Sequence, residues 1–103
     1  LAGVQQRVVL CGHSHIPRFV ELADGQTIVN PGSVGLPAYA DSQPAPHVME
    51  TFSPRASYAI LDRAAADWNV SFYRVHYDHF EAAAQARLLQ REDWAQGIST
   101  GRM

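Results

Sequence analysis

Hydrophobic and polar residues are arranged in short segments typical of β-strands over the first three quarters of the chain. Five segments carry this pattern: residues 7–11, 18–22, 26–30, 57–62 and 68–75. The first is apolar at successive positions, which predicts a strand that is buried on both faces. An Asp-Gly pair at 24–25 predicts a hairpin between the second and third segments, with residues 19–20 paired to residues 28–29.

The periodicity changes to that of a helix near residue 78. Asp78 followed by Glu81 is a capping box, and Phe80, Ala84 and Leu88 recur at helical spacing. We expect this stripe to pack the helix against the sheet. The chain is therefore predicted to be α/β, with mainly β-strands and one C-terminal helix.

Three further stretches are predicted to be less regular. Residues 31–55 contain five prolines, which predicts a long loop or lid near a functional site. Residues 91–94 predict a short helical turn, and residues 97–103 a frayed end. No repeat or internal boundary is evident, so residues 1–103 are expected to form part of a single domain.

The composition limits the classes of function. With 103 residues, 47% hydrophobic and 17% charged, the chain has the composition of one small globular domain. Its net charge of -2 gives no general attraction to nucleic acid or to acidic membranes. Its single cysteine cannot form an internal disulfide, and no apolar stretch is long enough for a membrane span. These features predict a cytoplasmic protein.

The segment Gly12-His13-Ser14-His15-Ile16-Pro17 carries the candidate chemistry. In an extended backbone, residues two apart project to the same side, with alpha carbons ~6 to 7 Å apart. Both imidazoles could then bind one metal ion, or two ions ~3.5 to 4 Å apart as in two-metal phosphoryl-transfer sites. Cys11 would lie on the same side; a buried, small hydrophobic residue is the favoured interpretation and a further ligand the alternative.

A second motif, Asn30-Pro31-Gly32-Ser33-Val34-Gly35-Leu36-Pro37, follows after the predicted hairpin. With the histidine motif, in this order and at this spacing, it resembles the calcineurin-like metallophosphoesterase superfamily, most closely its compact prokaryotic phosphodiesterase branch. The resemblance implies a two-sheet β-sandwich flanked by helices, of which this chain is the C-terminal portion. It also implies that His13 ligates one metal ion and His15 a neighbouring one.

The activity implied by the resemblance is hydrolysis of phosphodiesters or phosphomonoesters by a hydroxide activated between two divalent ions. Mn²⁺ is the expected metal, with Fe, Zn, Ni and Mg as alternatives. The expected substrate is a small phosphoester, and nucleotides are among the possible substrates. The family's other ligands lie in Asp-x-His, Gly-Asp and Gly-Asn-His motifs, which this sequence does not contain. A missing N-terminal half is therefore the expected partner, and this fragment alone is expected to be inactive.

Five other residues are candidates for contact with the substrate or the metal ligands. Asn30 and Ser33 have two interpretations, a turn that bonds its own backbone, which we favour, or contact with the site. Arg18 and Arg55 would either bind phosphate oxygens or remain solvated, and solvation is favoured. His47 would be a residue of the lid, a proton donor or, preferably, a surface histidine.

Further expectations concern the protein as a whole and a second metal site. A noncatalytic scaffold or interaction module with the metallophosphoesterase fold is the main rival to an enzyme. A homo-oligomer stays open, whereas nucleic acid and membrane partners are not expected. His76 and His79 are not predicted to form a second metal site, because the helix begins between them.

Overall fold

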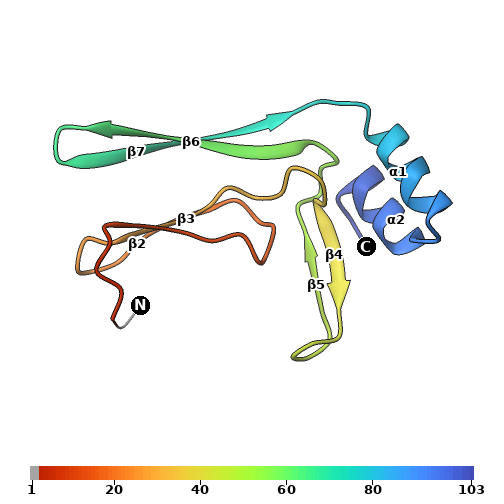
Figure 1. Ribbon diagram of the computed structural model, residues 1–103, viewed down its shortest axis with the longest axis horizontal. Helices are drawn as coiled ribbons and strands as arrows, with labels where there is room; N and C mark the ends of the chain where they lie inside the picture. The colour runs from red at the N-terminus through yellow and green to blue at the C-terminus, as the bar shows by residue number, and fades with distance from the viewer. Residues whose placement is uncertain (1–2) are drawn as a thin grey trace.

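The computed structural model describes residues 3–103, which form three small sheets and a pair of helices (Figure 1). The elements are β1 (Val8–Leu10), β2 (Arg18–Glu21), β3 (Thr27–Asn30), β4 (Ala38–Asp41), β5 (His47–Glu50), β6 (Ala56–Ala64), β7 (Asp67–Val75), α1 (His79–Leu88) and α2 (Glu92–Thr100). The predicted α/β class is confirmed. A second helix, α2, replaces the predicted short turn at 91–94.

The first sheet contains the predicted hairpin. Strand β2 runs antiparallel to β3 and pairs Phe19 with Val29 and Val20 with Ile28, as the Asp-Gly signal predicted. Within the turn, the Asp24 carboxylate accepts a hydrogen bond of 2.9 Å from the backbone N–H of Gln26. Local turn chemistry was therefore sufficient to fix this register.

Strand β1 does not have the burial that its apolar sequence suggested. It lies at the edge of the order β1-β3-β2 and, within residues 3–103, pairs only with β3. Leu10 is 66% exposed, and Cys11, predicted to be a buried small residue, is exposed as well. The physical reason is that β3 occupies the centre of the sheet, where Val29 is fully buried.

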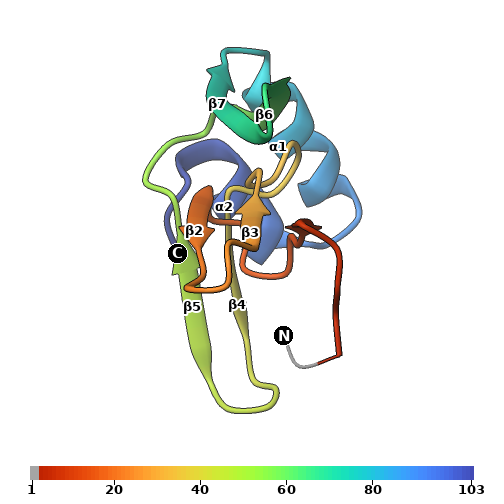
Figure 2. The same cartoon turned by 90° about the vertical axis from the view of Figure 1, so that its left-hand side faces the viewer.

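The predicted loop at 31–55 contains a β-hairpin instead. Strands β4 and β5 pair antiparallel from Ala38↔Glu50 to Asp41↔His47. The prolines do not interrupt these strands because they lie at the hairpin tip or outside the paired residues, where a missing N–H costs nothing. The hairpin projects away from the β6–β7 ribbon (Figure 2).

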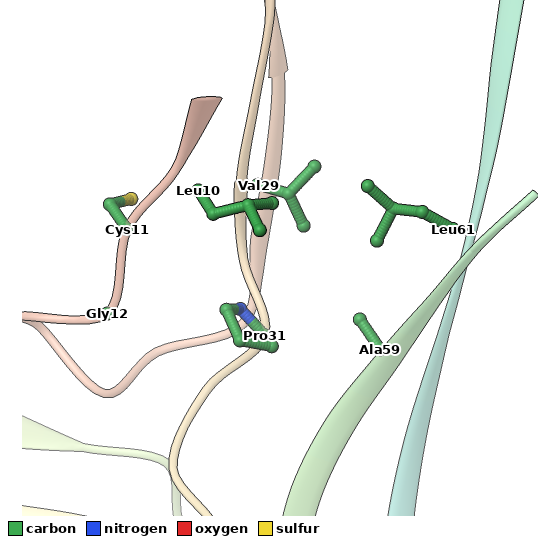
Figure 3. A pocket seen from close by; sticks show the side chains of 7 residues that line it. All are labelled: Leu10, Cys11, Gly12, Val29, Pro31, Ala59 and Leu61. Carbon is green, nitrogen blue, oxygen red and sulfur yellow. The ribbon is translucent and has the colours of Figure 1, made fainter. Parts of the chain in front are cut away.

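Strands β6 and β7 form a two-stranded ribbon, longer than predicted, that pairs from Ala56↔Val75 to Ala64↔Asp67. It lies over the first sheet in both views (Figures 1 and 2). An apolar cavity of about 390 Å³ separates the two layers, with Ala59 and Leu61 of β6 facing Leu10 and Val29 (Figure 3). This arrangement gives the two-layer part of the fold.

Helix α1 begins as predicted but packs differently. The Asp78 carboxylate caps it by accepting a 3.2 Å hydrogen bond from the N–H of Glu81. The predicted stripe faces solvent, with Leu88 83% exposed, and α1 packs on α2 rather than on the sheet. The buried residues of α1 are His79, Ala83 and Ala86. The two alanines pack with Ala95 and Ile98 of α2, because small side chains permit close packing of two short helices.

Helix α2 lies against β4 (Figure 1). Its buried residues are Ala95, Gly97 and Ile98, and it ends at Gly101 with φ +69°. Gly97 is so close to the Ala38 carbonyl that a side chain there would overlap it. The predicted frayed end is therefore wrong over residues 97–101, and this packing brings α2 to the histidine motif.

Candidate metal centre

The histidine motif forms a tight turn after β1. The backbone N–H of His15 donates to the carbonyl of Gly12 at 3.0 Å, and His15 has a left-handed φ of +62°. The sequence analysis assumed an extended backbone at residues 13–15, and this assumption is wrong. The two imidazoles nevertheless line one cavity.

The His15 ring is held by the segment that precedes β4. Its Nδ1 lies 2.8 Å from the carbonyl oxygen of Leu36, and its ring centroid lies 4.7 Å from that of Tyr39. A carbonyl oxygen only accepts, so Nδ1 must carry the hydrogen. In the neutral ring, Nε2 then has a free lone pair, which is the arrangement found in metal-ligating histidines.

His13 is positioned through its backbone. Its carbonyl oxygen accepts a 2.9 Å hydrogen bond from the Tyr39 hydroxyl, while its side chain is exposed. Tyr39 thus contacts both histidines, one through its hydroxyl and the other through its ring. The sequence had not singled out Tyr39, since it lies in the stretch predicted to be an irregular loop.

Asn30 and Ser33 have the turn contacts that the favoured interpretation predicted. Asn30 Oδ1 accepts from the N–H of Gly32 at 2.9 Å, and Ser33 Oγ accepts from the N–H of Leu36 at 3.0 Å. Asn30 Nδ2 also donates to Ser14 Oγ at 3.0 Å. The side chains of Asn30 and Ser33 therefore fix the loops around the imidazoles, and a direct contact with substrate stays a prediction.

The cavity beside the imidazoles has a volume of about 380 Å³. It is lined by His13, His15, Leu36, Tyr39, Ala40, Asp41, Arg91 and Trp94. Sequence reasoning missed Asp41, Arg91 and Trp94 as cavity residues. The last two come from the start of α2, where the only sequence signal was a predicted short helical turn.

Two charged groups in this lining have shifted pKa values. The pKa of Asp41 is lowered, mainly because its carboxylate accepts hydrogen bonds from the N–H groups of Gln43 and Ser42. The pKa of Arg91 is raised by its side-chain hydrogen bonds to Asp93. The cavity therefore presents one carboxylate and one guanidinium, both charged at neutral pH, beside two imidazoles.

A sequence profile of the calcineurin-like phosphoesterase superfamily domain matches residues 2–65, which is more than half of the chain. The chain belongs to the calcineurin-like phosphoesterase superfamily. In fold it is similar to a metallophosphoesterase from Sphaerobacter thermophilus, with a TM-score of 0.61 and 22% sequence identity. That alignment covers 95% of this chain and 43% of the other, so this chain spans less than half of its relative's length. No curated protein gives a significant match.

The remaining predicted residues of this calcineurin-like domain lie outside the cavity. His47 is paired with Asp41 in the hairpin, and its ring centroid lies 5.9 Å from that of Tyr39. Arg18 is exposed and lines a separate hollow beside Ser14 and Asn30. Arg55 is exposed just before β6. The structure therefore does not bring either arginine together with the imidazoles.

The donor atoms available for a metal are few in this part of the superfamily fold. Within residues 3–103, no group of three or more His, Cys, Asp or Glu side chains is placed to hold an ion. His76 and His79 have ring centroids 6.1 Å apart, and His79 is buried. Cys11 lines the apolar cavity of Figure 3 instead.

Among the described helices, none is long and apolar enough to cross a membrane.

Proposed function

We propose that the native protein containing this chain hydrolyses phosphoester bonds with divalent metal ions, and that His13 and His15 are two of the metal ligands. Superfamily membership supports the reaction class. The single observation that carries the ligand assignment is the 2.8 Å contact between His15 Nδ1 and the Leu36 carbonyl. It leaves Nε2 as the donor atom beside the cavity that His13 also lines.

The residues present fit a metal centre as part of a larger ligand set. Two neutral imidazoles are suitable donors for Mn²⁺, Fe, Zn or Ni, and less so for Mg²⁺. Two ions need more ligands than this chain gathers in its described residues, so the remainder would come from an N-terminal half of the same domain. We infer a binuclear centre containing Mn²⁺, with the present chain supplying one ligand to each ion.

Bound ions would activate water as the nucleophile and neutralise charge on the phosphoryl group. The chain's own residues have the task of positioning. Leu36 and Tyr39 hold the turn at His13 and His15, and Asn30 fastens Ser14 on the other side of it. The cavity volume of about 380 Å³ suits a small phosphoester, including a nucleotide.

The test is His15→Ala in the native protein, assayed for bound Mn²⁺ by elemental analysis and for hydrolysis of bis(4-nitrophenyl) phosphate. We expect loss of both metal and activity. His76→Ala is the matched control, because His76 is an exposed imidazole outside the cavity. A His15→Ala protein that retains the wild-type metal content and rate would refute the ligand assignment.

A noncatalytic scaffold with the same fold is the alternative to an enzyme. A native protein that binds no divalent metal and hydrolyses no phosphoester would support the scaffold.

A cytoplasmic location remains a proposal based on the single free cysteine.

A further inference from the structure

The start of α2 contributes a cationic part to the wall of the imidazole cavity. Arg91 and Trp94 line the cavity together with His13 and His15. We propose that Arg91 is a phosphate-binding residue, which donates from Nη1 to a phosphoryl oxygen of the substrate. The inference rests on the proposed function, since it assigns a residue of the segment between α1 and α2 to the proposed metal and substrate site.

The guanidinium of Arg91 is held in place before any ligand arrives. Its Nε and Nη2 donate to the two carboxylate oxygens of Asp93 at 3.1 Å and 3.0 Å. Its central carbon lies 3.8 Å from the ring centroid of Trp94. A planar group fixed by a two-point hydrogen bond and by stacking loses little freedom when it binds an anion.

One end of this guanidinium remains available. Within the described residues, no hydrogen-bond acceptor contacts Nη1, whereas Nε and Nη2 are both engaged. An unused pair of N–H donors in the wall of a cavity suits a phosphate oxygen, which accepts charge-assisted hydrogen bonds. Asp93 therefore orients the Arg91 guanidinium and leaves the Nη1 hydrogen-bond donors free among the described residues.

The other charge in the cavity lining does not cancel this role. The Asp41 carboxylate accepts hydrogen bonds from the backbone N–H groups of Ser42 and Gln43, at 2.7 Å and 3.2 Å. These donors offset part of its negative charge and hold it toward the β4–β5 turn. Arg91 is consequently the cationic side chain in this lining that can attract an anionic ester.

Substitution of Arg91 should preserve the helix. Arg91 is the N-cap residue of α2 but makes no side-chain capping bond, and its backbone N–H donates to the Ala86 carbonyl in any case. Arg87 provides a matched control. It forms a comparable ion pair with Glu92 at 3.3 Å, at the same helix junction, but does not line the cavity.

The experiment compares Arg91→Ala, Arg91→Lys and Arg87→Ala in the native protein loaded with Mn²⁺. We expect Arg91→Ala to raise the KM for bis(4-nitrophenyl) phosphate and the inhibition constant of inorganic phosphate by roughly tenfold or more, with metal content unchanged. Arg91→Lys should restore part of this loss because it keeps the charge, and Arg87→Ala should behave as wild type. If Arg91→Ala had the wild-type KM and inhibition constant, the proposal would be overturned. It would also be overturned if Arg91→Ala lost bound metal together with substrate affinity.

A second measurement separates this proposal from the proposed function. Trp68 is the second residue of β7, next to the β6–β7 turn, and this turn lies far from α2 (Figure 1). Trp68→Phe therefore leaves Trp94 as the one tryptophan of this chain, and the same protein with Trp94→Phe gives the emission of any tryptophan elsewhere in the native protein. Titration with inorganic phosphate should change Trp94 emission in that background but not after Arg91→Ala is added. If the wild type hydrolyses nothing, the proposed function fails, and this titration alone decides Arg91. No phosphate-dependent change in Trp94 emission would refute the binding role.

Discussion

Replacement of Gly97 by alanine tests the contact that brings α2 to the cavity. A Cβ at this position would overlap the carbonyl oxygen of Ala38, whereas ordinary contact begins at 3.4 Å. The backbones of α2 and β4 would have to separate by roughly 1 Å. Such overpacking costs about 1 to 3 kcal/mol. Alanine gains about 1 kcal/mol of helix propensity over glycine, which offsets part of that cost.

We therefore expect Gly97→Ala to destabilise the native protein by about 1 kcal/mol, although alanine has a higher helix propensity than glycine. Urea unfolding would measure the change, and hydrogen exchange of amides in β4 and α2 would locate it. Gly35→Ala is the control, since nothing lies within 4 Å of a Cβ built there and its φ is not positive. If Gly97→Ala were as stable as wild type, with unchanged exchange in β4, the close packing of α2 on β4 would be wrong.

Three further predictions concern single positions. Gly32 has φ +87° and a Cβ there would lie 2.7 Å from Ser57 Cβ and 2.9 Å from Pro17 Cγ, so Gly32→Ala should lower stability by about 1 to 3 kcal/mol. An unchanged unfolding midpoint would contradict this. Ala65 has φ +54° in the β6–β7 turn, so Ala65→Gly should stabilise by about 0.5 to 1 kcal/mol, and a lower melting temperature would contradict the assigned conformation. The pKa of Asp41 is lowered by the N–H groups of Gln43 and Ser42, so its stabilising effect is present above pH 3.8 and is lost as the pH falls through the folded value. A carboxyl NMR titration should place the Asp41 pKa below 3.8, and Asp41→Asn should remove this part of the acid dependence.

The elements predicted correctly are those that local chemistry determines. The Asp-Gly turn fixed the β2–β3 hairpin, and the pair Asp78 and Glu81 fixed the start of α1. In both, the residues that set the structure are within a few positions of one another. A single sequence therefore contains the whole signal.

The wrong predictions concern elements whose structure depends on packing between elements, or on where the prolines fall relative to the paired residues. Helix α2 has a glycine at position 97, which lowers helix propensity, but that glycine is required by the approach to Ala38. The stripe of Phe80 and Leu88 was assigned to the core because large apolar residues usually lie there, yet the close packing of α1 and α2 selects the alanines. Strands β4 and β5 were hidden by prolines that turn out to lie outside their paired residues.

The candidate site also combines residues that a local motif identifies with residues that packing brings to the cavity. The histidines were found from a local motif, but the groups that orient them, Leu36 and Tyr39, are 21 and 26 residues away from their partners. Arg91 and Trp94 are farther still and lie beyond residues 2–65, the part that matches the superfamily profile. The two histidines thus lie in the matched segment, whereas part of the cavity wall comes from α2. Because α2 reaches the cavity through the contact of Gly97 with β4, we expect changes at Arg91 to alter substrate binding and changes at Gly97 to alter both stability and substrate binding.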